Sequence, residues 1–328
     1  MPSATTRDTA QIPVIDISDS NPDAASQLLE AAATYGFVFI KNNEAGIPPA
    51  EIDNMFELRG DFKEAFNISA SNPTKPPSPL SGPLAANSAD LVAFSSACHA
   101  LCERILHHFA VALALESDWF TTRHDRSKGS SGNILRLLYY PSIGDDVELR
   151  PDEDDIRAGA HSDYGSVTLL FQRRGQPGLE ILTRQGKWES VPVDPSPSPS
   201  LSSSSGDADG STAVADAAAL PILVNIGDLL SYWTNNLLKS TVHRVIFPSP
   251  NANLTSPFKA ARAEDRYSIA YFCHPLDDAE LVPVPSRIVQ EYRADGVEEA
   301  GKGTVKGRAT ITARDHLNER LAATYGVK

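Results

Sequence analysis

Gly159-Ala-His161-Ser-Asp163-Tyr-Gly165 is the stretch of this sequence from which its fold and its chemistry are best inferred. In an extended backbone, side chains two positions apart point to the same side, so His161 and Asp163 can contact one ion together. An imidazole and a carboxylate suit borderline-hard divalent metals. A His-x-Asp pair also arises by chance in surface loops, so the segment predicts a metal site only together with a further ligand.

The further ligand that the sequence offers is His243, in the strand-like run Lys239-Ser-Thr-Val-His243-Arg-Val. Its apolar neighbours indicate a mostly buried strand, in which a histidine can also be an ordinary core residue. A set of two histidines and one carboxylate leaves three positions on a metal open for other molecules. His161, Asp163 and His243 are therefore the predicted metal ligands.

A third run alternates strictly: in Arg266-Tyr-Ser268-Ile-Ala-Tyr-Phe272, one face holds Arg266, Ser268 and Phe272. A guanidinium on an inward face is unfavourable unless it meets an anion. Arginine binds a carboxylate through two parallel hydrogen bonds, and a serine hydroxyl two residues on can add a third. Arg136 shares a face with Tyr140 in a similar run. For either arginine, an internal salt bridge with one of the 42 acidic residues is the alternative.

Composition limits the kind of partner. The formal net charge of −13 argues against binding a nucleic acid, whose phosphates would be repelled. No run approaches the roughly 18 to 20 apolar residues of a membrane span, and residues 1–11 lack the apolar core of an export signal. The three cysteines form no disulfide framework, and Cys98 and Cys102, which lie in an apolar helical pattern, are expected to be buried thiols. We expect a cytoplasmic protein that acts on a small molecule, with an oligomeric state that the sequence does not indicate.

The second part of the chain predicts a β core. After Gly132, short apolar runs separated by Gly, Pro and Asp predict strands in an antiparallel sandwich or jelly roll, at residues 134–140, 166–171, 179–182, 222–226, 242–247 and 266–273. Strands are also expected at 12–17 and 37–40. Helices are expected after Asn21-Pro-Asp with a stop at Gly36, over about 50–66 and 90–115, and from Thr312 to Tyr325, where Thr312-x-x-Asp315 indicates a capping box.

The fold class is therefore α+β: a jelly-roll core flanked by N-terminal helices. Residues 1–132 form the region packing on the core and 133–328 the jelly-roll region, within one structural domain. Residues 69–89 are expected to be loop. The face of the 90–115 helix that carries His99, Glu103 and His107 is expected to be solvated. Residues 194–219 are low in complexity and predict a disordered insertion.

Several stretches together resemble one known family, the iron- and 2-oxoglutarate-dependent oxygenases of the isopenicillin N synthase-like superfamily: IPVIDIS, YGFVFIKN, LRLLYYP, AHSDYGSVTLLFQ, PGLEI, VNIGDLLSYWTN, KSTVHRV and RYSIAYF. The resemblance covers most of 12–48 and 133–275. It implies a double-stranded β-helix, iron bound by His161, Asp163 and His243, and the distal carboxylate of 2-oxoglutarate bound by Arg266 and Ser268, with Tyr140 beside them.

Within this superfamily the sequence looks most like fungal thymine 7-hydroxylase-type oxygenases. That likeness implies hydroxylation of a small substrate, a pyrimidine or a secondary metabolite, with Phe272 and Tyr164 as stacking surfaces and Arg136 as a hydrogen-bond donor. The cofactors implied are Fe(II), 2-oxoglutarate and O2, with ascorbate as a candidate reductant. No side chain beyond the metal centre is expected to be catalytic, because metal and cosubstrate carry the hard chemistry.

The sequence departs from the family pattern in three places. After Met55 it runs directly into a segment that the family reaches only after some dozens of further residues, which puts substrate binding in doubt more than iron binding. The insertion at 194–219 lengthens the interval between Asp163 and His243, and Leu138 stands where plant relatives have Asn. Three alternatives stay open: an iron oxidase that does not use 2-oxoglutarate, a non-catalytic metal-binding relative, and a zinc hydrolase.

Overall fold

Two β-sheets form the core of the computed structural model, which describes residues 8–42, 45–57, 65–69, 80, 82–142, 155–195, 219–247, 265–292 and 310–326. The larger sheet contains, in spatial order, β1 (Val14–Ile15), β2 (Phe37–Ile40), β9 (Ile222–Ile226), β6 (Val167–Gln172), β11 (Arg266–Cys273), β4 (Ile134–Tyr140) and β3 (Ala65–Ser69). The smaller sheet contains β5 (Asp155–His161), β10 (His243–Phe247), β7 (Leu179–Leu182) and β8 (Trp188–Ser190). This jelly-roll core confirms the predicted fold class.

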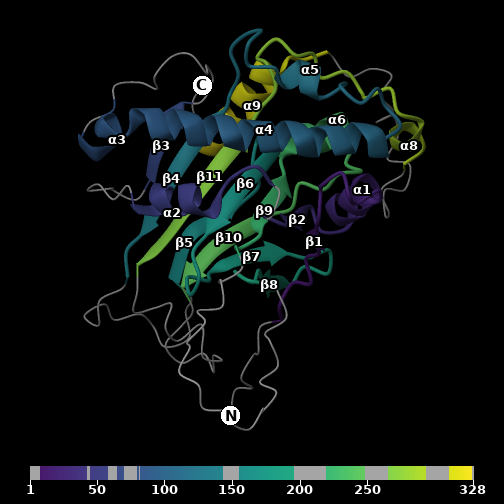
Figure 1. Ribbon diagram of the computed structural model, residues 1–328. Helices are drawn as coiled ribbons and strands as arrows, with labels where there is room; N and C mark the ends of the chain where they lie inside the picture. Colours follow the sequence, from purple (N-terminus) through teal and green to yellow (C-terminus); the bar gives the residue numbers. More distant parts are fainter. Residues whose placement is uncertain are drawn as a thin grey trace, which may run out of the picture.

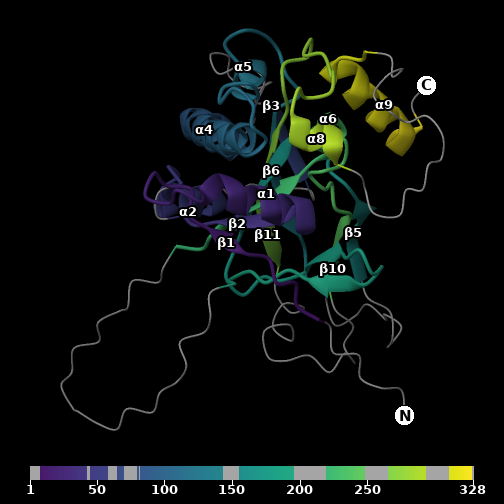
Figure 2. The ribbon, with the colours of Figure 1, turned by 90° about the vertical axis from the view of Figure 1, so that its right-hand side faces the viewer.

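Helices cover one face of the larger sheet. The long α4 (Ser88–Ala112) crosses it, with α1 (Ala24–Thr34) and α2 (Pro49–Glu57) alongside (Figures 1 and 2). The apolar stripe of α4 packs on the strands, as the tilted contact of Phe94 with Phe171 illustrates, with ring centroids 5.2 Å apart. The shorter described helices are α3 (Gly82–Ala86), α5 (Thr121–His124), α6 (Asp228–Trp233) and α8 (Arg287–Glu291).

The opposite face of the larger sheet meets the smaller sheet. Part of this interior is apolar, with Phe39 and Leu223 from the larger sheet packed with Leu179 and Val245 from the smaller one. Strand β11 shows how alternation divides the two faces. Its residues Ile269 and Tyr271 belong to the core that the helices cover. The alternate residues of the strand, Arg266, Ser268, Ala270 and Phe272, face the space between the sheets. A polar site can therefore form inside the sandwich without interrupting the main core.

One expected helix was wrong at its end. The helix expected over about 50–66 ends at Glu57, and Phe66 lies in β3, opposite Leu137 of β4. Pairing on the sheet edge buries Ile68, which is a tertiary effect that local helical periodicity does not contain. The expected loop at 69–89 was wrong at its C-terminal end, because it includes α3 and the first two residues of α4. Strands β5 and β8 were not among the predicted runs.

The expected solvated face of α4 was wrong for His99, which is only 4% exposed. Its two ring nitrogens hydrogen-bond the Tyr271 hydroxyl at 3.1 Å and the backbone carbonyl of His124 at 3.0 Å. The residue is thus a satisfied core histidine. The capping box of the last helix, α9 (Ala313–Tyr325), was predicted correctly: Thr312 and Asp315 exchange both hydrogen bonds.

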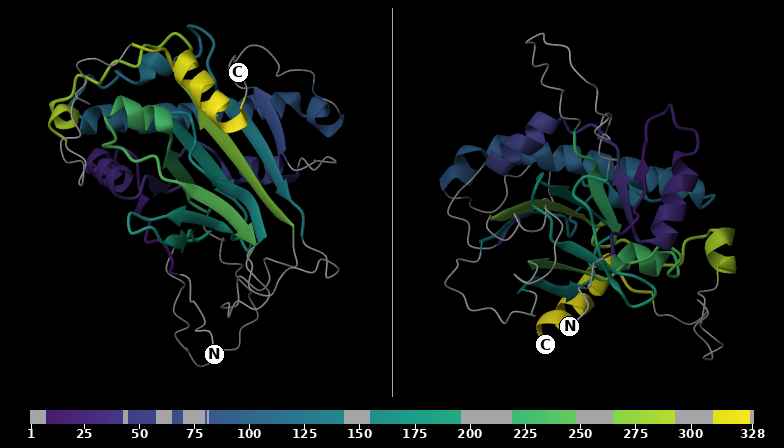
Figure 3. Two further views of the ribbon diagram at one scale, coloured as in Figure 1. Left: turned by 180° about the vertical axis from the view of Figure 1, so that it is seen from behind. Right: turned by 90° about the horizontal axis from the view of Figure 1, so that it is seen from below.

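Some expectations cannot be followed in the structure. Most of the insertion, residues 196–218, and residues 58–64 beyond the unusual junction after Met55 lie outside the described residues. The described helices include none that is long and apolar enough to cross a membrane. Figure 3 shows α9 (yellow) lying against one end of the sandwich.

Candidate metal centre and adjoining cavity

The sandwich brings His161, Asp163 and His243 together, although 80 positions separate the last two in the chain. His161 ends β5 and His243 begins β10, and the two are direct partners in the antiparallel ladder. Asp163 Oδ1 lies 3.9 Å from His161 Nε2 and 3.8 Å from His243 Nε2. Three ligand atoms, all within 4.8 Å of one another, surround a space of the size that one metal ion requires.

Backbone carbonyls fix the tautomers of both histidines. His161 Nδ1 donates to the carbonyl of Gly159 at 2.7 Å, and His243 Nδ1 donates to that of Thr241 at 3.1 Å. A carbonyl oxygen only accepts, so the proton sits on Nδ1 and the lone pair of each Nε2 points to the shared space. Burial lowers the pKa of His243, against the opposing effect of Asp163, which favours the neutral imidazole that a metal needs.

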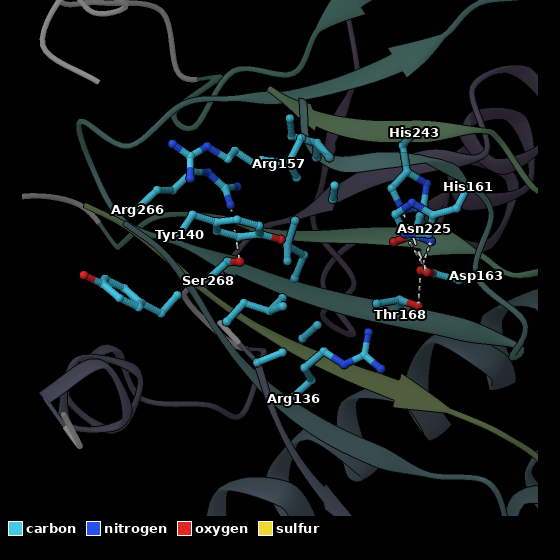
Figure 4. Close-up of a pocket in the computed structure, with 18 of the residues that line it drawn as sticks. Arg136, Tyr140, Arg157, His161, Asp163, Thr168, Asn225, His243, Arg266 and Ser268 are labelled. Atoms are coloured by element: carbon cyan, nitrogen blue, oxygen red, sulfur yellow. Dashed lines mark hydrogen bonds and ion pairs between the residues drawn. The ribbon is translucent and has the colours of Figure 1, made fainter. Parts of the chain in front are cut away.

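Asp163 is held by two side chains that the sequence reasoning did not assign. Its Oδ2 accepts hydrogen bonds from Thr168 Oγ1 at 2.6 Å and from Asn225 Nδ2 at 2.7 Å, which leaves Oδ1 for an ion (Figure 4). Burial alone would raise the pKa of Asp163, but His243 and these two hydrogen bonds outweigh it, and the pKa lies below its usual range. The carboxylate is therefore ionised at neutral pH.

Thr168 and Asn225 are direct partners in the β6–β9 ladder, so the larger sheet presents both donors at one place. Each is a buried polar side chain in a mostly apolar strand, at 4% exposure for both. That contrast was the available signal in the sequence, because a buried polar group needs a partner. The donor set as a whole fits a divalent metal such as Fe(II): two oriented imidazoles, one ionised carboxylate and open positions toward a cavity.

The cavity that adjoins the three residues has a volume of about 510 Å³ and contains Arg266 at its other end (Figure 4). Arg266 is 2% exposed, and its Nε has no hydrogen-bond partner among the described residues. No carboxylate among the described residues forms an ion pair with Arg266. The internal salt bridge that was the alternative for this arginine is therefore not observed there. A buried guanidinium with a free donor favours a site for an anion.

Ser268 and Tyr140 lie beside this guanidinium, as expected. Ser268 Oγ accepts a hydrogen bond from Arg266 Nη1 at 3.4 Å, and the Tyr140 ring centroid is 5.2 Å from the guanidinium carbon. Burial lowers the pKa of Arg266, with Tyr140 acting in the opposite direction, but an arginine stays charged in a protein. Arg157 of β5 also lines the cavity, packed 4.7 Å from the ring of Phe247, and was not assigned from the sequence.

Arg136 and Phe272 line the same cavity on neighbouring strands, with the guanidinium carbon 5.0 Å from the Phe272 ring centroid. Arg136 Nε donates to Asn67 Oδ1 of β3 at 2.6 Å, a contact that sequence reasoning missed because β3 itself was not expected. One cavity is therefore lined by the three candidate ligands, a buried guanidinium, and a mixed aromatic and cationic surface.

Tyr164 is placed differently from the expectation. It does not line the cavity formed by the described residues, and its hydroxyl forms a hydrogen bond of 2.6 Å with Thr324 Oγ1 of α9. The contact with α9 holds the hydroxyl outside the cavity. The expected role as a stacking surface for substrate thus gains no support from the structure.

The jelly roll and its clustered His, Asp and His beside a buried arginine define a class of protein, the mononuclear non-haem iron oxygenases. Comparison with protein families agrees with this class. The profile of the 2OG-Fe(II) oxygenase superfamily matches residues 131–208 and 201–275, and a profile described as non-haem dioxygenase in morphine synthesis N-terminal matches residues 12–72. The chain belongs to the 2OG-Fe(II) oxygenase superfamily, in which Fe(II) and 2-oxoglutarate are the cofactors.

Curated relatives include a UPF0676 protein of Schizosaccharomyces pombe, 30% identical over 362 aligned positions that cover 96% of this chain and 93% of the relative. The alignment is longer than the 328 residues of this chain, so the relative has residues without a counterpart here. The proline hydroxylase buaE of Petromyces alliaceus is 29% identical, over 81% of this chain and 69% of its own length.

Solved structures give the same answer for the fold. The full-length thymine 7-hydroxylase of Neurospora crassa, solved with alpha-KG and thymine, has a TM-score of 0.69 and 25% identity, and the match covers 98% of this chain and 99% of that one. The rice dioxygenase for auxin oxidation has a TM-score of 0.60 at 19% identity, with coverage of 97% and 96%, and shows the likeness of fold alone.

Proposed function

We propose that this protein is a dioxygenase that uses Fe(II), 2-oxoglutarate and O2 to hydroxylate a small organic molecule, with His161, Asp163 and His243 as the iron ligands. The supporting observation is the buried Arg266 with its unpartnered Nε, at the far end of the cavity that the three ligands share. Arg266 and Ser268 bind the distal carboxylate of 2-oxoglutarate, and Tyr140 packs on the guanidinium.

When bound, iron supplies the oxygen chemistry, coupled to decarboxylation of 2-oxoglutarate to succinate. The protein contributes by holding the ligands and the reactants in place. Thr168 and Asn225 keep Asp163 ionised and oriented, the backbone carbonyls keep both imidazoles in the ligating tautomer, and the cavity places the cosubstrate and the substrate beside the metal. No side chain in this arrangement needs to act as a general base.

The surface formed by Arg136 and Phe272 is the proposed substrate side of the cavity. A flat ring that accepts hydrogen bonds suits this surface, because Phe272 offers an aromatic face and Arg136, held by Asn67, offers hydrogen-bond donors beside it. Because the Neurospora thymine 7-hydroxylase was solved with thymine, thymine and uracil are the first compounds to test. Proline is a useful comparison, since buaE is a proline hydroxylase.

The test is 2-oxoglutarate turnover under air, with succinate and O2 uptake measured together, with and without ascorbate and each compound. We expect slow succinate formation with Fe(II) alone and faster formation when a substrate is present. O2 uptake without succinate would instead favour an oxidase that draws all electrons from its substrate. The absence of a visible charge-transfer band with anaerobic Fe(II) and 2-oxoglutarate would favour a non-catalytic relative. The cytoplasmic location stays a prediction.

A further inference from the structure

We infer that Asp228 and Arg320 are positioning residues of the metal centre, so that the docking of the C-terminal helix α9 is part of how this site is assembled. The inference rests on the proposed ligands His161, Asp163 and His243. Neither residue lies among the three clustered ligands or lines the cavity that adjoins them. Their proposed effect is exerted through the two segments that carry the ligands.

The carboxylate of Asp228 links these two segments. Its Oδ2 accepts a hydrogen bond of 3.1 Å from Ser162, the residue between His161 and Asp163. Its Oδ1 accepts a hydrogen bond of 2.6 Å from Ser240, three residues before His243. One side chain therefore connects the segment that follows β5 with the segment that precedes β10. These two segments are next to the proposed ligands in the chain.

The backbone of α6 holds Asp228 firmly in this position. Its N–H donates to the carbonyl of Asp163 at 2.7 Å, and the next N–H, that of Leu229, donates to Gly165 at 3.1 Å. A Cβ on Gly227 would lie 2.2 Å from the Gly165 carbonyl oxygen, so the two backbones approach as closely as only glycine permits. The carboxylate therefore keeps a constant relation to the turn that carries Asp163.

Arg320 of α9 provides the cation for this carboxylate. Its Nη2 lies 2.6 Å from Asp228 Oδ2 and 3.5 Å from Ser162 Oγ, and its guanidinium carbon is 5.6 Å from the Tyr164 ring centroid. The Tyr164 hydroxyl in turn contacts Thr324 one turn further along α9. The helix thus touches both residues that flank Asp163, which gives Tyr164 a place in helix docking rather than in the cavity.

The energetic consequence follows from burial. The side chain of Asp228 is 16% exposed, so removal of Arg320 would leave a largely buried carboxylate without its cation. Ser162 and Ser240 alone do not neutralise that charge. The carboxylate would then be expected to draw water or shift, and to move Ser162 and the neighbouring ligands with it. Groups that hydrogen-bond metal ligands directly change metal affinity about 10- to 100-fold when they are removed, and because Asp228 acts through Ser162 and Ser240 we expect an effect near the lower end of that range.

The same helix offers a matched control. Arg314 of α9 forms an ion pair with Asp277, and the exposures of this pair, 46% and 21%, are close to the 41% and 16% of Arg320 and Asp228. Asp277 lies in a segment that carries none of the proposed ligands. If α9 contributes only to general stability, replacement of either arginine should lower stability to a similar extent. If α9 also supports the metal centre, only the replacement of Arg320 should weaken metal binding.

The experiment measures anaerobic Fe(II) affinity by calorimetry, and the Tm of the metal-free protein, for wild type, Asp228→Asn, Arg320→Gln, Arg320→Lys and Arg314→Gln. We expect Asp228→Asn and Arg320→Gln to weaken Fe(II) binding by roughly tenfold or more. Arg320→Lys should recover much of the loss because it restores the charge. Arg314→Gln should lower Tm to a similar extent as Arg320→Gln and leave Fe(II) affinity unchanged.

Two results separate this inference from the proposed function. If wild type itself binds no Fe(II), the proposed function is wrong and the inference falls with it. If wild type binds Fe(II) and the Asp228 and Arg320 variants bind it equally well, or if Arg314→Gln weakens binding as much as Arg320→Gln does, the inference alone is wrong. Should Asp228→Asn fail to fold, Thr324→Val, which removes only the contact with Tyr164, is the milder variant, and unchanged Fe(II) affinity there counts against the coupling.

Discussion

His243 lies directly opposite His161 in the β10–β5 ladder, and the centroids of their rings are 4.4 Å apart. Directly opposed residues of an antiparallel pair point to the same face of the sheet. The ladder therefore sets the spacing of the two imidazoles before any ion is bound. Asp163, which follows β5 by two residues, completes the cluster from the turn.

Replacement of His243 by alanine should abolish Fe(II) retention, because one imidazole of the three ligands is lost and Asp163 loses a neighbour. The measurement is iron content after anaerobic loading and gel filtration, together with the charge-transfer band formed with 2-oxoglutarate. His108→Ala, a half-buried histidine outside the cluster, serves as the control. Fe(II) binding of wild-type strength in the His243 variant would rule out the ligand assignment.

Replacement of Arg266 by alanine should weaken 2-oxoglutarate binding by about 2 to 5 kcal/mol, the range for removing one partner of a desolvated charge pair. Fe(II) affinity should stay near that of wild type, since Arg266 lies at the other end of the cavity. Calorimetry with the metal-loaded protein measures both. An unchanged affinity for 2-oxoglutarate would contradict the proposed carboxylate site.

Replacement of Thr168 by valine removes one of the two hydrogen bonds to Asp163 Oδ2 at nearly constant volume. The pKa of Asp163 should rise, and Fe(II) affinity should fall about tenfold. Thr234→Val, at a fully buried threonine that hydrogen-bonds the backbone of α6, is the matched control for loss of a buried hydroxyl. Equal Fe(II) affinities in the two variants would show that Thr168 does not support the ligand.

Acid should destabilise the metal-free protein through His274, whose pKa burial lowers from 6.5 to about 4. Between these two values the unfolded chain binds a proton that the folded chain does not, so the free energy of unfolding falls as the pH falls, by up to about 1.4 kcal/mol per pH unit. The contribution is fully present above pH 6.5.

The measurement is urea unfolding at several pH values between 4 and 7 for wild type and His274→Gln. The variant should be less stable at neutral pH, because glutamine fills the tight space beside Gly132 and Gly165 poorly. It should also lose less stability on acidification. Parallel pH profiles for the two proteins would argue against a neutral buried His274.

Much of the site could be inferred from local pattern. Alternation in β11 places Arg266 and Ser268 on one face whatever the sheet looks like, and the His-x-Asp spacing follows from extended backbone. The strand that carries Arg266 and Ser268 was predicted because its apolar run is short and clearly bounded, whereas β5, which ends at His161, was not among the predicted strands. Strand β3 was mistaken for the end of a helix, because its stability comes from pairing with β4 rather than from its own sequence.

The sequence by itself determined which chemical groups are present and which of them share a strand face, because side-chain direction along a strand is a local property. Only the tertiary structure decided that His243 stands opposite His161, that Thr168 and Asn225 hold Asp163, and that Tyr164 turns to α9. Each of these is a contact between segments distant in the chain, set by sheet register and helix docking. Local sequence patterns do not encode that register, whereas the packed sandwich does.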